Sequence, residues 1–289
     1  MSSAAGLAFS KAFTEHRKGD GKLSGNSTLH YYAFLSSVFR KGVQWGVIAE
    51  NPCARAERPK ASEIDVQILD EEGIARLMEA LEDAPAQLSV IVQLALLTGA
   101  RRGEICGLRW SDIDLDAGTI SINRTVQYIS GSGIVFNSPK TRKSKRCLKI
   151  GADCVELLRE YRQIQREPRL RMGSAWVRTV DICGKTIKND LIFTRADGAP
   201  FDPHSITSWF SKFLKANDLT SAHFHSLRHS NAILLIADHV PVSAVSGRLG
   251  HANISTTLNI YTSAIQSADA AAANSLESTF ERIKEKNHA

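Results

Sequence analysis

The sequence LGHANISTTLNIYT at residues 249–262 decides the fold and the chemistry that we expect of this chain. It places His251 directly after a glycine and Tyr261 ten residues further on. Asparagine and serine residues follow His251 and favour the start of a helix, so we expect Tyr261 on a helix behind a tight turn. By itself, a tyrosine on an amphipathic helix is most often a packing residue. Its meaning therefore depends on the residues upstream.

A second polar segment, HSLRHS at residues 225–230, precedes this stretch. His225 and Arg228 are three residues apart, so on a helix they share one face and can point at a single anion. A metal site is an alternative, because His223 and His229 lie close by in the sequence. We do not expect one, since the H-x-x-x-H pair lacks the adjacent glutamate of zinc peptidases and no cysteine lies near. We expect His229 to pack or cap locally.

A third segment, TGARRGE at residues 98–104, follows an apolar helix that we expect at residues 88–97. Gly99 marks the end of that helix, so the side chain of Arg101 can leave the core near a helix terminus. An arginine in such a position usually forms a salt bridge at the helix end. By chemistry alone, Arg102 could be the functional arginine instead.

Between these segments lies a strongly basic stretch, in which Lys140 forms part of the tripeptide PKT. The stretch has no acidic residue, and its cations are Lys140, Arg142, Lys143, Lys145, Arg146 and Lys149. A solvated basic hairpin is the simpler interpretation of such a charge run. A polyanionic partner is the other, and the net charge of +6 and the isoelectric point of about 9.1 favour it modestly.

Two arginines, a lysine, two histidines and a tyrosine are the groups that can break and rejoin a phosphodiester without a metal. Guanidinium groups stay charged and donate paired hydrogen bonds to phosphate, which suits a transition state that accumulates negative charge. A lysine can protonate the leaving 5′ oxygen, and a base or a positive field can help the tyrosine to lose its proton. Each motif alone is weak, but their combination in one order is specific.

In this order and spacing, the array resembles the tyrosine recombinases, the phage-integrase family of site-specific DNA recombinases. Residues 98–104 and 108–113 are similar to the family's first box, and residues 225–230 and 249–261 are similar to its second. The similarity is closest to integrases of phages and conjugative elements from bacteria.

The resemblance implies a role for each residue of the array. Tyr261 would attack the scissile phosphate and leave a 3′-phosphotyrosyl bond and a free 5′ hydroxyl. Arg101, selected by the family pattern Thr-Gly-x-Arg, would hold and stabilise the phosphate together with Arg228 and His251. His225 would assist the handling of protons.

Lys140 would act as the general acid toward the leaving oxygen, with Lys143 or Lys145 as the fallback because three lysines crowd this segment. Glu104 resembles an acid that in this family orients a catalytic group rather than reacting itself. The resemblance implies neither a metal nor a nucleotide cofactor, because the covalent bond conserves the energy of the broken phosphodiester.

The implied partners are double-stranded DNA attachment sites, and no membrane is implied. We expect DNA contacts from Arg142, Lys143, Lys145, Arg146, Lys41 and Arg40. We expect residues 263–286 to form a helix that docks on a neighbouring protomer, which suggests a homotetramer on paired sites; packing onto its own domain is the alternative. The resemblance also allows an accessory DNA-bending or directionality protein.

The expected fold class is α+β and mainly helical: a mixed α/β catalytic domain with a small β-sheet, preceded by a short helical core-binding domain. We place the core-binding domain at residues 1–60, a polar linker at 61–68 and the catalytic domain with its C-terminal helix at 69–289. The region before Ser27 is too short for a full core-binding domain. Either the chain is a fragment of a longer integrase or its clamp on DNA is reduced.

Local patterns place the secondary-structure elements. We expect a helix at residues 28–39, capped by Asn26 and Ser27, and another that Asp70 opens. Further along we expect strands at 119–122, 125–129 and 146–150 in one small sheet, a turn at 130–133, and helices at 153–166 and over most of the chain after 205.

The composition excludes several classes of protein. The chain has 289 residues, enough for one large and one small domain, and no apolar run approaches the length of a membrane span. Its five cysteines are scattered and never form a C-x-x-C pair, which argues against a disulfide framework or a zinc ribbon. Since the N-terminus shows no secretory signal, we expect a cytoplasmic protein.

Two other functions compete with recombination. A DNA-binding relic or regulator with this fold would be catalytically silent, and the presence of all the catalytic residue types argues against it. A type IB topoisomerase would use similar chemistry as a monomer, but the two boxes and the C-terminal helix favour recombination. We therefore expect a site-specific recombinase for the integration or excision of a mobile element.

Overall fold

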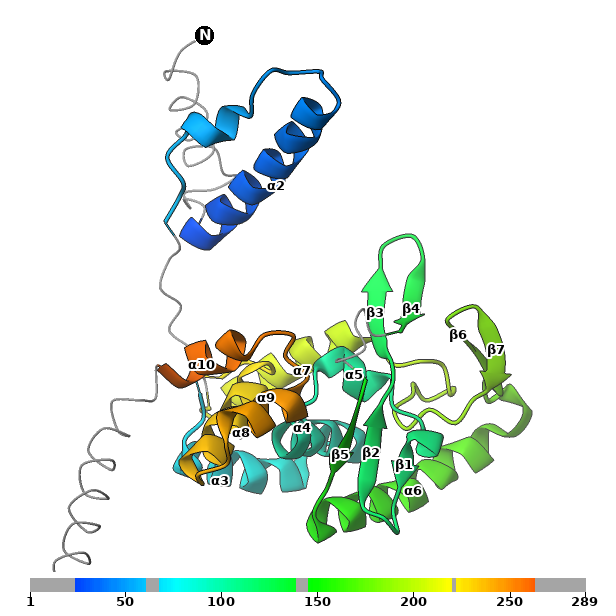
Figure 1. Ribbon diagram of the computed structural model, residues 1–289. Coiled ribbons are helices and arrows are strands. Elements are labelled where there is room, and N and C mark those ends of the chain that lie inside the picture. Colours follow the sequence, from blue (N-terminus) through cyan, green and yellow to red (C-terminus); the bar gives the residue numbers. More distant parts are fainter. Residues whose placement is uncertain (1–23, 61–67, 139–144, 220–221, 263–289) are drawn as a thin grey trace, which may run out of the picture. The chain divides into compact units, whose positions relative to one another are not determined.

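The structure is a computed structural model that divides the chain into two compact units, Met1–Asp65 and Val66–Ala289. The residues that it describes are 24–60, 68–138, 145–219 and 222–262. These are mainly helical, with small antiparallel sheets, as the sequence predicted (Figure 1). No helix among the described residues is long and apolar enough to cross a membrane.

The first unit is built on helix α2, Gly25–Gln44. Its N-cap is Ser24, whose hydroxyl accepts a hydrogen bond from the backbone of Ser27 at 3.2 Å. The predicted cap at Asn26 and Ser27 was therefore wrong, because the helix has already begun at those residues.

A short 3-10 helix, η1 (Pro52–Arg55), packs against α2 in the same unit. The hydroxyl of Tyr32 donates to the carbonyl of Cys53 at 2.8 Å, and the amide of Asn51 donates to the carbonyl of Ser36 at 3.1 Å. These two bonds attach η1 to one face of α2.

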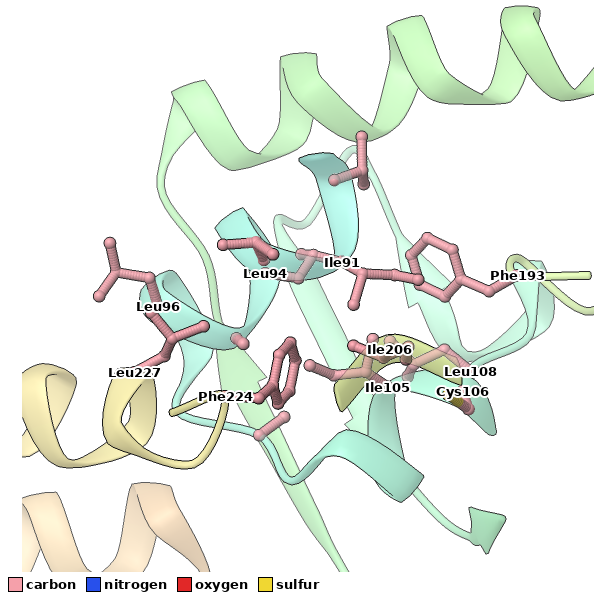
Figure 2. Close-up of a cluster of buried hydrophobic side chains, with 14 of the residues drawn as sticks. Ile91, Leu94, Leu96, Ile105, Cys106, Leu108, Phe193, Ile206, Phe224 and Leu227 are labelled. Atoms are coloured by element: carbon pink, nitrogen blue, oxygen red, sulfur yellow. The ribbon is translucent and has the colours of Figure 1, made fainter. Parts of the chain in front are cut away.

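Helix α4, Ala86–Thr98, lies at the centre of the second unit. Its buried residues occur on every side rather than along one stripe, which is typical of a helix surrounded by protein. It packs against α8, Ser226–Ala237, and α6, Ala152–Met172. Figure 2 shows Ile91 and Leu94 of α4 within the buried cluster. The apolar helix predicted here is confirmed.

Two small antiparallel sheets contain the strands that the sequence predicted. The first sheet consists of β1 (Ile113–Asp114), β2 (Thr119–Ile122) and β5 (Arg146–Lys149), and the second of β3 (Thr125–Ile129) and β4 (Gly133–Asn137). The prediction of a single sheet was wrong, because β5 pairs with β2 and sets Leu148 opposite Ile120, both buried. The basic stretch therefore connects a strand of one sheet to a strand of the other.

The second unit contains further helices and strands. They are α3 (Glu71–Ala80), η2 (Leu81–Asp83), α5 (Arg102–Cys106), η3 (Trp110–Asp112), η5 (Gly173–Ala175), β6 (Thr179–Ile182), β7 (Lys185–Lys188), α7 (Pro203–Ala216), α9 (Val242–Leu249) and α10 (Ile254–Thr262). Asp70 caps α3 as predicted, accepting a hydrogen bond from the backbone of Gly73 at 2.8 Å. Helix α6 extends beyond the predicted 153–166. The β6–β7 hairpin was missed, although polar and apolar residues alternate at 179–182 and Gly184 marks its turn.

Gly99 ends α4 in the left-handed backbone conformation, with φ of 62°. It also lies where other elements approach most closely: a Cβ atom there would meet Cδ2 of Leu249 at 2.3 Å and Oδ1 of Asn231 at 2.8 Å. Backbone conformation and space both exclude a larger residue. The turn after α4 therefore lies directly against α8 and the end of α9.

We expect Gly99→Ala to lower the free energy of unfolding by about 2–4 kcal/mol, the sum of left-handed backbone strain and overpacking. Gly184→Ala is the matched control, because Gly184 has φ of 76° but no atom within 4 Å of an added Cβ. It should lose only the strain, about 1–2 kcal/mol. Urea denaturation of both variants measures the difference, and equal losses would contradict the close approach at Gly99.

Candidate active site

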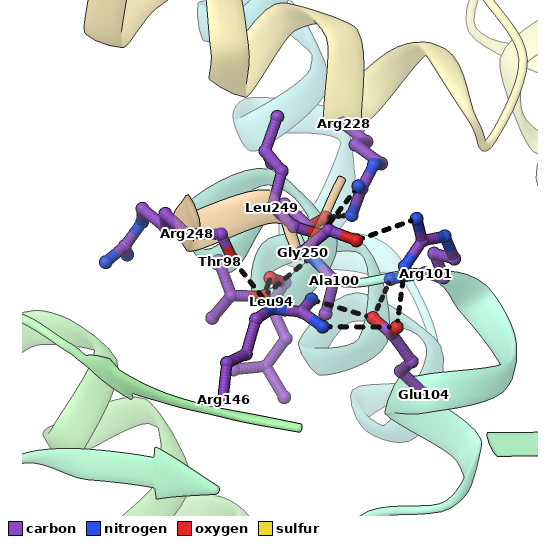
Figure 3. Close-up of polar contacts among 11 residues, drawn as sticks. Leu94, Thr98, Ala100, Arg101, Glu104, Arg146, Arg228, Arg248, Leu249 and Gly250 are labelled. Atoms are coloured by element: carbon purple, nitrogen blue, oxygen red, sulfur yellow. Dashed lines mark hydrogen bonds and ion pairs between the residues drawn. The ribbon is translucent and has the colours of Figure 1, made fainter. Parts of the chain in front are cut away.

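The turn after α9 is the point at which several residues predicted to be catalytic meet. Gly250 ends α9 in the left-handed conformation with φ of 67°, and His251 follows it, donating its backbone N–H to the carbonyl of Ser246 at 3.1 Å. A Cβ atom on Gly250 would lie 2.8 Å from Nη1 of Arg146. A guanidinium group therefore lies directly on this turn, as Figure 3 shows.

Arg228 is buried against the same turn and is only 2% exposed. Its Nη2 donates to the carbonyl of Leu249 at 2.7 Å, and its Nη1 donates to the carbonyl of Gly99. Both carbonyls lie at helix C-termini, where the backbone has partial negative charge that stabilises a cation. Burial, reinforced by the positive charge of Arg101, lowers the pKa of Arg228 to about 9, so the group stays protonated at neutral pH.

Arg101 approaches the turn from the start of α5 (Figure 3). Its Nη2 donates to the carbonyl of Gly250 at 3.4 Å, and its Nη1 donates to Oε1 of Glu104 at 2.9 Å. The side chain is 41% exposed, so part of the guanidinium faces solvent. The neighbouring Arg102 instead donates to Thr207 on α7. The geometry therefore favours Arg101 over Arg102 as the arginine of this site.

Glu104 lies between two arginines and is 6% exposed. One of its oxygens accepts from the backbone N–H of Arg101 at 2.9 Å, and the same oxygen accepts from Nη2 of Arg146 at 2.8 Å. Burial alone would raise the pKa of Glu104, but hydrogen bonding and charge from Arg146, followed by those from Arg101, hold the pKa below its ordinary value. The carboxylate is therefore charged and holds both guanidinium groups in place.

Arg146 lies in a different environment from the one expected for a DNA-contacting residue. Its side chain is 7% exposed, donates to both carboxylate oxygens of Glu104, and donates through Nε to the carbonyl of Arg248 at 2.7 Å. The strand pattern contained the signal, because Arg146 shares one face of β5 with the buried Leu148. We therefore assign Arg146 to holding Glu104 rather than to a DNA phosphate.

Three histidines lie in the field of these arginines. The rings of His225 and His229 meet edge to face, with centroids 4.7 Å apart. Burial lowers the pKa of His225, and it lowers the pKa of His229 and of His251 to about 4; in each case the charge of Arg228 adds to the effect. The histidines are therefore neutral at neutral pH.

The charge of the cluster favours an anion. Arg101, Arg146 and Arg228 contribute three positive charges, and within the described part of the chain Glu104 is the carboxylate that pairs with them. The local field is therefore positive, which suits a phosphate group. In the same part of the chain, no group of three or more histidine, cysteine or carboxylate side chains is placed to hold a metal ion.

His251 has a partner that the sequence analysis missed. Its Nδ1 lies 2.7 Å from Oγ1 of Thr257, whose side chain is fully buried. Thr257 belongs to α10, and Tyr261 lies one helical turn further along this helix. The backbone of Tyr261 is described, while its side chain lies outside the described part of the structure. A threonine four residues before the tyrosine was the available signal.

The other predicted residues are divided between the surface and the part of the chain that is not described. Those outside the described residues are Lys140, Arg142, Lys143 and the segment 263–286. Those on the surface are Lys145, which precedes β5, and Arg40 and Lys41 on α2.

Comparison with known proteins places the chain in one family. The profile of the Phage integrase family matches residues 67–267. The chain belongs to the phage integrase family. It is 30% identical over 261 residues to a tyrosine recombinase XerC-like protein of Caldanaerobacter subterraneus, and 26% identical over 249 residues to the ICEBs1 integrase of Bacillus subtilis. Both alignments cover 86% of this chain but 64% of the relative, so the chain spans less than two thirds of the length of these curated relatives.

Solved structures of integrases have the same fold as this member of the family. The Tn1549 transposon integrase in complex with transposon right end DNA superposes with a TM-score of 0.74 at 18% identity, over 90% of this chain and 81% of that one. A lambda integrase dimer bound to a COC′ core site gives a TM-score of 0.60 at 20% identity, over 90% of this chain and 64% of that one. At these identities the likeness establishes the fold.

Replacing Arg146 by methionine tests its role in holding Glu104. The variant should lose about 3 kcal/mol of unfolding free energy and should raise the pKa of Glu104, because burial remains while the main stabilising charge is gone. Carboxyl NMR titration measures that pKa. Arg124→Met is the matched control, since Arg124 forms a similar buried pair with Asp112 away from this site. It should leave the Glu104 titration unchanged, and an unchanged titration in Arg146→Met would contradict the assignment.

The lowered histidine pKa values predict how stability depends on pH. In the folded state His229 and His251 titrate at about 4 instead of the ordinary 6.5, so below pH 6.5 the unfolded chain binds more protons. Their contribution to the free energy of unfolding is complete above pH 6.5 and declines as the pH falls toward 4. Urea unfolding across this range should show a shallower decline for His229→Gln than for the unchanged protein. His30→Gln, on the exposed face of α2, serves as the control, and parallel curves for all three proteins would contradict the prediction.

Proposed function

We propose that this chain is a site-specific DNA recombinase that cleaves and rejoins DNA through a 3′-phosphotyrosyl intermediate, for the integration or excision of a mobile element. The observation that carries the proposal is the positive cluster at the turn of residues 249–251, which is followed by the short helix α10 that contains Tyr261. Family membership supports it, since the relatives are named as recombinases and integrases and the solved neighbours contain DNA.

The phosphate would bind between Arg101 and Arg228. The guanidinium of Arg228 is buried and oriented by two backbone carbonyls, while that of Arg101 is partly exposed and oriented by Glu104. Donors that are already oriented do not have to reorganise when negative charge develops on the phosphate oxygens, which is the main source of electrostatic catalysis. His251 would add a further hydrogen bond from the same turn.

Tyr261 would be the nucleophile, and the positive field would favour the loss of its phenolic proton. His225 lies at the start of α8, where loss of water around its ring, then the charges of Arg228 and Arg101, lower its pKa, so it can accept a proton at neutral pH. Lys140 would protonate the leaving 5′ oxygen, with Lys143 or Lys145 as the fallback. No cofactor takes part in this proposal.

Double-stranded attachment-site DNA would be the substrate. We propose that residues 1–60 act as a core-binding clamp, that 61–68 link it to the catalytic domain at 69–289, and that DNA contacts come from Arg40, Lys41, Arg142, Lys143 and Lys145. A homotetramer on paired sites, with an accessory DNA-bending or directionality protein, would carry out the exchange in the cytoplasm. The backbone of DNA would supply most of the affinity, so binding should weaken steeply with salt.

A nicked suicide duplex from the end of the element tests the central step. With EDTA present, the unchanged protein should form a covalent adduct that is visible on a denaturing gel, and Tyr261→Phe should form none. Tyr128→Phe, which alters an exposed tyrosine on β3, is the matched control and should form the adduct normally.

Measurements of DNA binding, of relaxation and of strand exchange, made beside the adduct assay, separate the alternatives. Intact DNA binding without an adduct would reject the recombinase and favour a silent DNA-binding relic or regulator. An adduct accompanied by relaxation of supercoiled DNA, without strand exchange between two sites, would favour a topoisomerase.

A further inference from the structure

The contact between His251 and Thr257 joins two parts of the site that are separated along the chain. Nδ1 of His251 and Oγ1 of Thr257 are 2.7 Å apart, well within hydrogen-bond distance. His251 lies on the turn that receives Arg101 and Arg228, whereas Thr257 lies in α10. Thr257 is 0% exposed, so its hydroxyl cannot exchange this partner for bulk water.

The burial of Thr257 favours one direction of the hydrogen bond, from the hydroxyl to the ring nitrogen. A hydroxyl has one proton to donate, and a buried donor needs an acceptor. Among the described residues, Nδ1 of His251 is the side-chain partner of this hydroxyl. Donation of the hydroxyl proton to Nδ1 would satisfy this buried donor, and a neutral imidazole that accepts at Nδ1 has its own proton on Nε2.

From this geometry we infer that Thr257 is a positioning residue, which holds His251 as the Nε2–H tautomer and so makes it a hydrogen-bond donor to the anion bound at the turn. The inference rests on the proposed function for the identity of that anion, a DNA phosphate. In the other tautomer, Nε2 would present a lone pair and would repel a phosphate oxygen.

The same bond couples the nucleophile helix to the phosphate site. Residues four apart on a helix lie on one face, so Thr257 and Tyr261 occupy the same face of α10, about one turn apart. When α10 is seated so that Thr257 reaches His251, the imidazole is prepared as a donor. A displaced α10 would remove Thr257 from Nδ1, and the tautomer of His251 would no longer be fixed. The position of the helix that contains Tyr261 would therefore determine whether His251 is a hydrogen-bond donor.

The neutral state that this role requires agrees with the charges around the ring. Burial, then the charges of Arg228 and Arg101, then His229 and His225, lower the pKa of His251 to about 4. At neutral pH the ring therefore has a single proton, on either Nδ1 or Nε2.

Three substitutions on α10 test the role of Thr257. Thr257→Val keeps the volume and branching of the side chain but removes the hydroxyl, and Thr257→Ser restores the hydroxyl. Thr256→Val makes the same chemical change at an exposed neighbouring position and controls for helix propensity. Thermal unfolding is measured for each variant, so that loss of folding is recognised separately.

The first readout is nitrogen NMR of the His251 ring in the free protein at neutral pH, which distinguishes a protonated from an unprotonated nitrogen. We expect Nε2–H in the unchanged protein, in Thr257→Ser and in Thr256→Val, and a mixture of tautomers in Thr257→Val. Protonation of Nδ1 in the unchanged protein would overturn the inference, whatever the outcome of any activity assay.

The second readout is the single-turnover rate of adduct formation on the suicide duplex. Thr257→Val should slow cleavage by roughly 10- to 100-fold, somewhat less than the loss of a complete oxyanion donor, with little change in DNA affinity. Thr257→Ser should recover most of the rate. A folded Thr257→Val that cleaves at the unchanged rate would overturn the inference. If the unchanged protein forms no adduct, the proposed function fails, while the NMR result still decides the tautomer.

Discussion

The buried guanidinium of Arg228 is the constraint on which the rest of the site depends. It replaces the water that it loses on burial with two backbone carbonyls, those of Gly99 and Leu249. Each carbonyl lies at the C-terminus of a helix, α4 or α9, where backbone dipoles are most favourable for a cation. Both helices end in left-handed glycines, which bend the chain away and let the two ends meet at one side chain. The two glycine turns therefore determine both how α4 and α9 end and where the guanidinium of Arg228 lies.

A cluster of three arginines would repel itself without a balancing charge. Glu104 supplies that charge from a buried position, and it binds Arg101 and Arg146 at once. The balance is incomplete, because one carboxylate faces three guanidinium groups among the described residues. The remaining positive charge contributes to the lowered pKa values of the neighbouring histidines. A bound phosphodiester, with its single negative charge, would offset part of this positive charge, so the free site favours an anionic ligand.

Much of this site could be predicted from local sequence. Arg101, Arg228 and His251 lie in short motifs whose spacing is set by helices and turns, and they meet at one turn, with the ring of His225 within reach of the arginine charges. What local patterns could not supply was the pairing of distant segments. The prediction of a single sheet was wrong because β5 pairs with β2, which is distant in the sequence. Buried contacts decide that pairing, and the alternation of polar and apolar residues within each strand does not reveal it.

The same limit explains the prediction for Arg146. The sequence shows it only as one cation in a basic stretch, whereas the pairing of β5 with β2 brings it to the buried Glu104. Thr257 was missed for a related reason, since a threonine shows no polar role until its burial and its partner are known.

The partners of Arg228 are main-chain oxygens, and this has a consequence for divergence within the family. A side-chain partner can be lost by one substitution, whereas every residue provides a carbonyl. Changes at Leu249 would alter the shape of the contact but could not remove the acceptor itself. An arginine anchored in this way can keep its orientation when the side chains around it change.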